Sequence, residues 1–208
     1  MDCSTKPTKR QIRAVAAFDF DGTLTYHDTL FYFLLYTHGI AQAFYHFFFL
    51  LPAFIAYLIG RLDRQETKEK VLHRFFSGTS INEVRKKGEA FAKEKLHSHL
   101  RPKAMQRLQW HQQQGHFCVL ISASLDVYLQ PWAKMTGFQE SLTSRLADIN
   151  GIVTGKLIGE NCRGPEKVRR LQGLLGPRDD YFLYASGDSD GDSELLAFAD
   201  APFYQKFE

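Results

Sequence analysis

A chain of 208 residues is long enough to bury a core in one domain, with room for a smaller inserted one. Hydrophobic residues make up 44% and charged residues 24%, which is ordinary for a folded protein and excludes a disordered chain. The formal net charge of +3 is too small to indicate a nucleic-acid partner, and none is expected. Three widely spaced cysteines, Cys3, Cys118 and Cys162, indicate neither a disulfide framework nor a CxxC metal site.

The amino-terminal segment is polar and basic, and it lacks the apolar run of a signal peptide. We therefore expect residues 1–12 to be a disordered lead-in. Because the sequence shows no export signal and no disulfide pattern, the expected location is the cytoplasm.

Four short apolar runs end abruptly in polar residues and predict strands at 13–20, 116–121, 181–185 and 202–207. Such runs are typical of buried parallel strands whose carboxyl ends open into loops. Helical patterns lie between them at 102–114, 126–136 and 166–175. The alternation predicts an α/β fold with a Rossmann-like, mostly parallel sheet.

Residues 26–100 interrupt this alternation and show only helical patterns, including a charged helix at 82–96. We predict a helical cap inserted directly after the first strand. The catalytic core would then consist of residues 13–25 and 101–208. Within the core, Asn150-Gly151 is a strong tight-turn signal between two β-prone runs.

Polar side chains gather where the predicted strands end. Asp19 and Asp21 close the first strand ahead of a turn at Gly22, and Ser122 closes the second. Ligands of such sheets bind at the carboxyl ends of the strands, so these side chains are candidates for one site. One carboxylate could attack phosphorus while the other handles the proton of the leaving group. The Ser122 hydroxyl and nearby backbone N–H groups could hold a phosphate oxygen.

Charges of both signs are available to the same site. Lys167 opens a predicted helix and could neutralise phosphate charge, while residues 187–192 (GDSDGD) concentrate carboxylates after the third strand. Clustered carboxylates suit Mg²⁺, which takes few protein ligands and keeps several waters. Phosphoryl transfer depends mainly on positioning and charge neutralisation, and these residues supply both.

In this order, DFDGT (19–23), a strand-terminal serine, a lysine and GDSxxD (187–192) resemble the four motifs of the haloacid-dehalogenase superfamily. The resemblance runs from Arg13 to the carboxyl terminus. The helical insertion after the first motif and the stretch NCRGPEK (161–167) are similar to the subclass that contains phosphoserine phosphatase. This resemblance implies a Mg²⁺-dependent phosphomonoester hydrolase that works through an aspartyl-phosphate intermediate.

The resemblance also implies roles for individual residues. Asp19 would be the nucleophile, Asp21 the general acid and then the base, and Lys167 the partner of the nucleophile and phosphate charges. Mg²⁺ would be bound by Asp19, by Asp188 and by the backbone carbonyl of Asp21, with Asp192 in the outer metal shell or orienting the lysine. The residues expected to bind phosphate or substrate are Gly22, Thr23, Ser122, Ala123 and Asp28.

Three positions depart from the phosphoserine phosphatase pattern. Gly22 stands where a serine commonly follows the second aspartate, Asp28 occupies the position of a substrate-reading glutamate, and Gly191 replaces an asparagine. The phosphatase chemistry tolerates all three changes. They argue against transferring phosphoserine to this chain as the substrate, which we leave open.

Residues 41–60 (AQAFYHFFFLLPAFIAYLIG) are close in length to the ~20 residues that span a bilayer. Pro52 and His46 argue against a span, and basic residues follow at Arg61, Arg64, Lys68 and Lys70. Three interpretations stay open: a buried pair of lid helices, a surface that dips into the membrane interface, or a homodimer contact. The second would place the protein at the inner face of the membrane. An apolar segment flanked by basic residues at this place in the chain also resembles phosphatidylglycerophosphate phosphatases of the same subclass.

The sequence thus predicts a phosphatase for a small phosphorylated metabolite, acting as a monomer or homodimer. A lipid-phosphate phosphatase at the membrane surface is the first alternative. A phosphotransferase would use the same residues but pass the phosphoryl group to an alcohol. A non-catalytic phosphate-binding protein is the last alternative, and the presence of both Asp19 and Asp21 argues against it.

Overall fold

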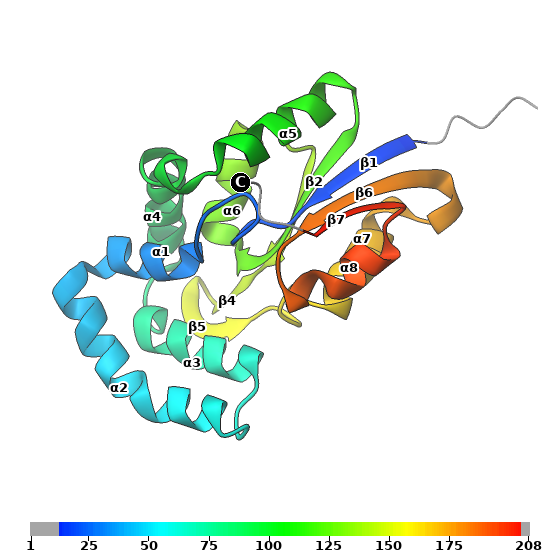
Figure 1. The fold of residues 1–208 in the computed structure, drawn as a ribbon. Helices are drawn as coiled ribbons and strands as arrows, with labels where there is room; N and C mark the ends of the chain where they lie inside the picture. Colours follow the sequence, from blue (N-terminus) through cyan, green and yellow to red (C-terminus); the bar gives the residue numbers. More distant parts are fainter. Residues whose placement is uncertain (1–12, 205–208) are drawn as a thin grey trace, which may run out of the picture.

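The computed structural model describes residues 13–204. The lead-in predicted at 1–12 therefore lies outside the described residues. The strand predicted at 202–207 lies within them only up to residue 204. Within them, the chain folds into an α/β unit whose sheet carries helices on both faces, with a group of helices beyond one end of the sheet (Figure 1).

The sheet has five strands in the order β3-β2-β1-β6-β7, and each neighbouring pair is parallel. Its strands are β1 (Arg13–Phe18), β2 (Phe117–Leu125), β3 (Glu140–Ser144), β6 (Tyr181–Gly187) and β7 (Ala201–Tyr204). In the central register, Phe18 lies opposite both Leu120 and Ser186, so the carboxyl ends of β1, β2 and β6 meet at one edge. The predicted Rossmann-like, mostly parallel sheet is confirmed.

Side-chain alternation along β1 divides the core into two apolar clusters. Ala16 and Phe18 face α5 (Pro102–Gln113) and α6 (Asp126–Met135). Val15 and Ala17 face the opposite way, toward the other two core helices. These are α7 (Pro165–Leu175) and α8 (Ser193–Phe198). Because both faces of the strand are buried, the sequence of β1 is a continuous apolar run.

The region 141–157 differs from the simple hairpin that its turn signal suggests. The turn itself is confirmed, with positive φ at Asn150 (51°) and Gly151 (81°) between the antiparallel β4 (Leu146–Ile149) and β5 (Ile152–Leu157). The first β-prone residues instead form β3, which pairs with β2 in the main sheet. The first predicted strand is also shorter than expected, ending at Phe18 so that Asp19 is the first residue beyond it.

Helices occupy the chain between the first strand and α5. They are α1 (Thr29–His38), α2 (Ile40–Leu58), α3 (Arg64–Phe76), α4 (Ile81–Glu94) and the short η1 (Leu96–His99). A bridge between Thr25 and Leu100 brings the two ends of this segment together. Two further short helices, η2 (Arg178–Asp180) and η3 (Asp190–Asp192), flank β6. We call α1–α4 the cap.

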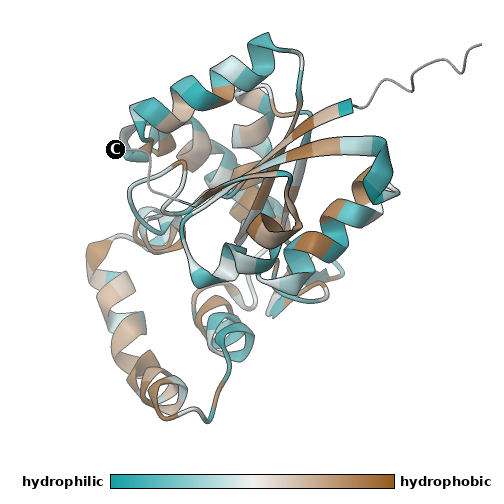
Figure 2. Cartoon of the chain, turned by 45° about the vertical axis from the view of Figure 1, so that its right-hand side comes forward, coloured by the Kyte–Doolittle hydropathy of each residue, from teal (hydrophilic) through white to brown (hydrophobic). Residues whose placement is uncertain are grey.

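The apolar segment predicted at 41–60 forms one long helix, α2, and not a buried pair of helices. Only Ala43 and Leu50 are buried among its residues. Among the described residues, α2 is the one helix long and apolar enough to cross a membrane, with a mean hydropathy of 1.5. Figure 2 shows it as a largely hydrophobic helix at the edge of the molecule, and most of its large apolar side chains are exposed.

Candidate active site

Asp19 lies at the carboxyl edge of the sheet, directly after β1. Its backbone N–H donates to the Ser186 carbonyl at 2.9 Å, which fixes it beside β6. Lys167, in the first turn of α7, donates to Asp19 Oδ1 and to Asp192 Oδ1, each at 2.6 Å. All three charged side chains are buried. The fold thus brings together three of the residues predicted from separate motifs.

Burial and charge oppose each other in this cluster. Burial raises the pKa of Asp19 to about 6, against the attraction of Lys167, which lowers it. Burial alone would lower the pKa of Lys167, but the charges of Asp19 and Asp192 raise it above its ordinary value. Lys167 therefore holds its positive charge beside the carboxylate that we expect to attack.

Asp192 organises the loop after β6 as well as the lysine. Its Oδ2 accepts hydrogen bonds from the backbone N–H groups of Asp188 (3.3 Å) and Ser189 (3.1 Å), and from Ser189 Oγ (2.9 Å). Gly187 makes this possible, because a Cβ there would lie 2.5 Å from the Cβ of Asp192. Of the two roles expected for Asp192, orienting Lys167 is the one with a direct contact.

Asp188 approaches Asp19 from the same loop. One carboxylate oxygen from each of Asp19, Asp188 and Asp192 lies within 4.8 Å of the others. Gly22 leaves the space that Asp188 occupies: its φ is +85°, and a Cβ there would lie 2.2 Å from Asp188 Oδ2. Three carboxylates around one ammonium leave an excess of negative charge in an oxygen-rich site. These residues fit Mg²⁺, and Asp19 and Asp188 would hold it.

Of the residues expected to bind phosphate, Gly22, Ser122 and Ala123 line the cavity at this edge of the sheet. Ser122 is buried, and its Oγ accepts a hydrogen bond from the Ser124 N–H at 3.0 Å. The structure places Thr23 differently. Its side chain is fully buried away from the cavity and donates to Asp188 Oδ1 at 3.3 Å, so its contact is with a metal-site carboxylate.

Asp21 is held by residues that the sequence did not single out. Its Oδ1 accepts hydrogen bonds from the backbone N–H (2.7 Å) and hydroxyl (2.6 Å) of Thr29, and its Oδ2 accepts one from Ser124 Oγ at 2.5 Å. Burial, followed by the nearby charge of Asp28, raises the pKa of Asp21 to about 7. A carboxyl group with a pKa near neutrality can give up a proton and take one back, as an acid–base catalyst must.

Thr29 is the first residue of α1, where backbone N–H groups have no partner within the helix. The N–H of Thr29 is therefore free to hold Asp21. Asp28 caps the same helix by accepting from the Leu30 N–H at 2.8 Å, and it also lines the cavity. The position predicted to read the substrate thus has a capping role in the structure, alongside its place on the cavity wall.

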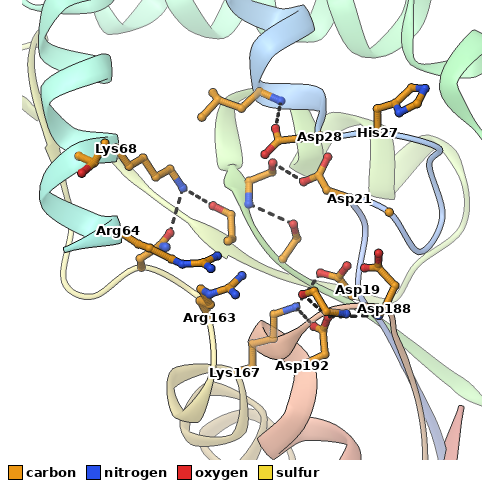
Figure 3. Close-up of a pocket in the computed structure, with 18 of the residues that line it drawn as sticks. Asp19, Asp21, His27, Asp28, Arg64, Lys68, Arg163, Lys167, Asp188 and Asp192 are labelled. Carbon is orange, nitrogen blue, oxygen red and sulfur yellow. Dashed lines mark hydrogen bonds and ion pairs between the residues drawn. The ribbon is translucent and has the colours of Figure 1, made fainter. Parts of the chain in front are cut away.

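Three basic side chains without an assigned role also line the cavity: Arg64, Lys68 and Arg163. The ammonium group of Lys68, on α3, donates to the Ala123 carbonyl and to Asn161 Oδ1, the latter at 2.9 Å. Figure 3 shows Arg64 and Lys68 entering the cavity from α3 and Arg163 from the loop before α7, across from Asp21 and Asp28. They give the cavity a positive wall that the four motifs did not predict.

Arg64 and Arg163 both pair with the exposed carboxylate of Asp190, Arg64 at 3.4 Å. Gly191, one of the departures from the phosphoserine phosphatase pattern, lies under Arg163. A Cβ at this glycine would be 2.3 Å from Arg163 Nη1. The glycine therefore leaves room for an arginine at the mouth of the cavity.

The cavity has a volume of about 520 Å³ and lies between the sheet edge and the cap (Figure 3). Its floor carries Asp19, Lys167, Asp188 and Asp192, and its cap side includes Thr67, Val71 and Tyr57. A volume of this size suits a small organic molecule. The predicted Asp19, Asp21, Gly22, Asp28, Ser122, Ala123, Lys167, Asp188 and Asp192 all line this one cavity.

Comparison with known proteins gives the family. Residues 16–197 match the model of the haloacid dehalogenase-like hydrolases. The chain belongs to this family. It is thus a hydrolase of the haloacid-dehalogenase type, and the resemblance inferred from its four motifs is confirmed. Protein CicA of Caulobacter vibrioides is 36% identical over 194 residues, which cover 93% of this chain and 86% of CicA.

Two solved structures share the fold of this chain. A protein of unknown function from Bordetella pertussis Tohama I superposes with a TM-score of 0.80 at 24% identity, covering 93% of this chain and 90% of that one. A phosphoserine phosphatase, solved as an analogue of its phospho-aspartyl intermediate, superposes with a TM-score of 0.61 at 18% identity, covering 93% and 87%. At these identities the similarity shows a common fold, including the helical insertion.

Proposed function

We propose that this hydrolase is a Mg²⁺-dependent phosphatase that forms an aspartyl-phosphate on Asp19. The observation that carries the proposal is the convergence of Asp19, Lys167 and Asp188 under one cavity, with Asp21 held separately above them. A nucleophile, a fixed positive charge, a cation site and an acid–base group are the parts that phosphoryl transfer through a carboxylate needs.

In the first step, a carboxylate oxygen of Asp19 attacks phosphorus and the bond from phosphorus to the substrate oxygen breaks. Asp21 gives its proton to the leaving alcohol, while Lys167 compensates negative charge at the phosphate. The raised pKa of Asp21, about 7, leaves it protonated in a useful fraction of molecules near neutral pH. Bound at Asp19 and Asp188, Mg²⁺ would neutralise phosphate charge and hold it against the nucleophile.

In the second step, the ionised Asp21 takes a proton from water as the water oxygen attacks phosphorus. The bond to Asp19 breaks, inorganic phosphate leaves, and Asp21 is protonated again. Thr29 and Ser124 fix the carboxylate through both steps. The cap covers the cavity, which limits competing access by water during the first step.

Two experiments on the full chain test this mechanism with an aryl phosphate as substrate. Activity should be lost in a chelator and return when Mg²⁺ is added. A rapidly acid-quenched reaction should contain protein-bound phosphate that hydroxylamine releases, as an acyl phosphate requires. Activity that persists in chelator, or protein-bound phosphate that resists hydroxylamine, would contradict the proposal.

Product analysis with an added alcohol separates the alternatives. Equal yields of released alcohol and inorganic phosphate are expected for a hydrolase. Phosphate recovered on the added alcohol would indicate a phosphotransferase, and no turnover of any substrate would indicate a binding protein. We keep the cytoplasm, or the inner face of the membrane, as the proposed location.

The positive cavity wall supports a substrate with a second anionic group beyond the phosphate that is cleaved. No carboxylate among the residues of the described chain lies within salt-bridge distance of the Lys68 ammonium group. Its pKa is lowered to about 8 by burial, with Asp28 and Asp21 opposing the shift and Arg170 adding to it. An anion on the substrate would relieve this cost of burial and raise the pKa again. Both a small metabolite and a lipid phosphate can carry such a group.

Replacing Lys68 with glutamine should therefore raise KM about tenfold to a hundredfold for phosphoglycerate and much less for glycerol phosphate. The two substrates differ by one carboxylate, so they isolate the charge. In the unaltered protein, the ratio of kcat/KM for phosphoglycerate to kcat/KM for glycerol phosphate should fall as the pH rises through about 8, because Lys68 then loses its charge in the free enzyme. Loss of the proton from Asp21 lowers kcat/KM for both substrates and leaves this ratio unchanged.

Lys103→Gln is the matched control, since this exposed lysine on α5 does not line the cavity. This fall in the ratio of the two kcat/KM values should disappear in Lys68→Gln and persist in Lys103→Gln. If the KM of each substrate is the same in Lys68→Gln as in the unaltered protein, Lys68 only fastens the cap to the core.

A further inference from the structure

Helix α2 is hydrophobic along most of its length (Figure 2), and its outward face is apolar from one end of the helix to the other. Its exposed side chains recur every three or four residues, which places them on one stripe. The stripe consists of Ile40, Phe44, Phe48, Leu51, Ile55 and Leu58, which are between 49% and 80% exposed. A surface helix in water normally carries polar side chains on this face. Such a contiguous apolar surface indicates an interaction site.

The opposite stripe of α2 already has its partners. Ala43 and Leu50 are buried, and Phe47 and Phe54 pack against the core cluster of the cap. Tyr57, near the end of the helix, lines the catalytic cavity. The inward stripe therefore packs the cap together. Packing within the cap does not explain why the outward stripe is also apolar.

A groove of about 760 Å³ between α2 and α3 adds positive charge beside this stripe. Phe49 and Pro52 belong to its apolar wall, and Arg61, Lys70 and Arg74 supply cations. None of these three cations forms an ion pair with another of the residues at 13–204. Arg74 lies over the Phe49 ring at 4.7 Å, and its buried Nε has no hydrogen-bond partner.

We propose that α2 docks on an anionic lipid bilayer, with its outward stripe inserted at the interface and the groove cations facing headgroup phosphates. An apolar face combined with cations at its border is the pattern of helices that lie in a membrane surface. Phosphate oxygens would also accept hydrogen bonds from the cations that line the groove. The docking is independent of the proposed reaction and requires no catalysis.

The packing of the cap makes α2 lie along the membrane and not across it. At 19 residues α2 is long enough for a span. However, the helices at its two ends touch each other, with the rings of Phe33 on α1 and Phe76 on α3 only 5.7 Å apart. A span would place α1 and α3 on opposite sides of the bilayer. The contact between them holds both on one side.

Charge also favours a bilayer over a second copy of the chain. A two-fold contact through α2 would bring the same surface of both copies together. The cations at Arg61, Lys70 and Arg74 would then approach their own counterparts. An anionic surface instead attracts every one of them. The same orientation would set the mouth of the catalytic cavity, which Tyr57 and Arg64 line, close to the headgroups.

Vesicle flotation with the full chain tests the docking, because aggregated protein sinks while bound protein rises. The protein should float with vesicles of phosphatidylcholine and phosphatidylglycerol, and much less with phosphatidylcholine alone. Phe48→Glu with Ile55→Glu should lower the partition coefficient at least about tenfold. Ile149→Glu with Ile158→Glu, at exposed isoleucines of the β4–β5 region, is the matched control and should leave it unchanged.

Arg61→Gln with Lys70→Gln should weaken binding to the anionic vesicles and leave binding to phosphatidylcholine unchanged. Three results would overturn the docking. The first is no flotation with anionic vesicles, and the second is equal flotation of the Phe48→Glu/Ile55→Glu and unaltered proteins. The third is equal flotation with anionic and with phosphatidylcholine vesicles. Light scattering distinguishes the second copy, since a dimer that dissociates on Phe48→Glu without vesicle binding would assign the stripe to self-association. Activity on aryl phosphate should survive all these substitutions, so a failed docking leaves the proposed reaction standing.

Discussion

Asp19→Asn is expected to lower kcat by at least about a thousandfold with an aryl phosphate. The amide cannot supply the negative oxygen that attacks phosphorus, and it cannot be turned over as a leaving group in the second step. Asparagine keeps the shape of the side chain and can still accept the Lys167 hydrogen bond, which measures 2.6 Å in the native protein. The variant should therefore fold, and its loss should be specific to the chemistry.

The prediction is checked by steady-state kinetics together with acid quenching. Asp19→Asn should show no phosphate bound to protein, whereas Asp21→Asn, which keeps the nucleophile, should accumulate it with an activated aryl substrate. Asp179→Asn changes an exposed carboxylate remote from the cavity and controls for charge alone. Appreciable turnover by Asp19→Asn would mean that another group attacks phosphorus.

The floor of this site was predictable because its residues come at strand ends. Asp19, Ser122 and Asp188 each follow a buried apolar run, and parallel strands bring such positions to one edge. Lys167 opens a helix that packs beside the same edge. Periodicity and motif order were enough to predict their convergence, although they give no distances.

The supports of Asp21 were not predictable in the same way. Thr29 and Ser124 reach it from the start of α1 and the end of β2, and neither carries a motif of its own. Thr23 shows the opposite case. Its position in the first motif predicted contact with phosphate, whereas in the structure its side chain is buried and donates a hydrogen bond to Asp188. Which hydroxyl meets which carboxylate depends on loop conformation, and hydrophobic pattern does not encode it.

For the basic stretch after α2, helical spacing could have predicted which cations lie on the same face of α3. Arg64 and Lys68, one turn apart on α3, both line the catalytic cavity, whereas Arg61 and Lys70 line the groove beside α2. Treated as one run, these four cations suggested one role. Residues four apart share a helix face, which groups Arg64 with Lys68 and separates them from Lys70. Arg61 precedes α3, so helical spacing gives no position for it.

Lys167→Met is expected to cost about 3–5 kcal/mol in the free energy of unfolding and to abolish turnover. The substitution leaves the buried carboxylates of Asp19 and Asp192 without the ammonium group between them. Urea unfolding in chelator measures the first effect, since a bound cation would offset the repulsion. Arg169→Gln, on the exposed side of the same helix, removes one of the two arginines that pair with Glu166 and should cost less than about 1 kcal/mol, because Arg170 keeps its pairing with this carboxylate.

A double variant separates the structural and catalytic contributions of the lysine. Adding Asp192→Asn to Lys167→Met removes one of the two repelling charges, so part of the lost stability should return. Activity should not return, because the phosphate would still lack the positive charge that Lys167 places beside Asp19. If stability and activity recover together, Lys167 serves only to neutralise Asp192. If stability alone recovers, the ammonium group acts on the reacting phosphate itself.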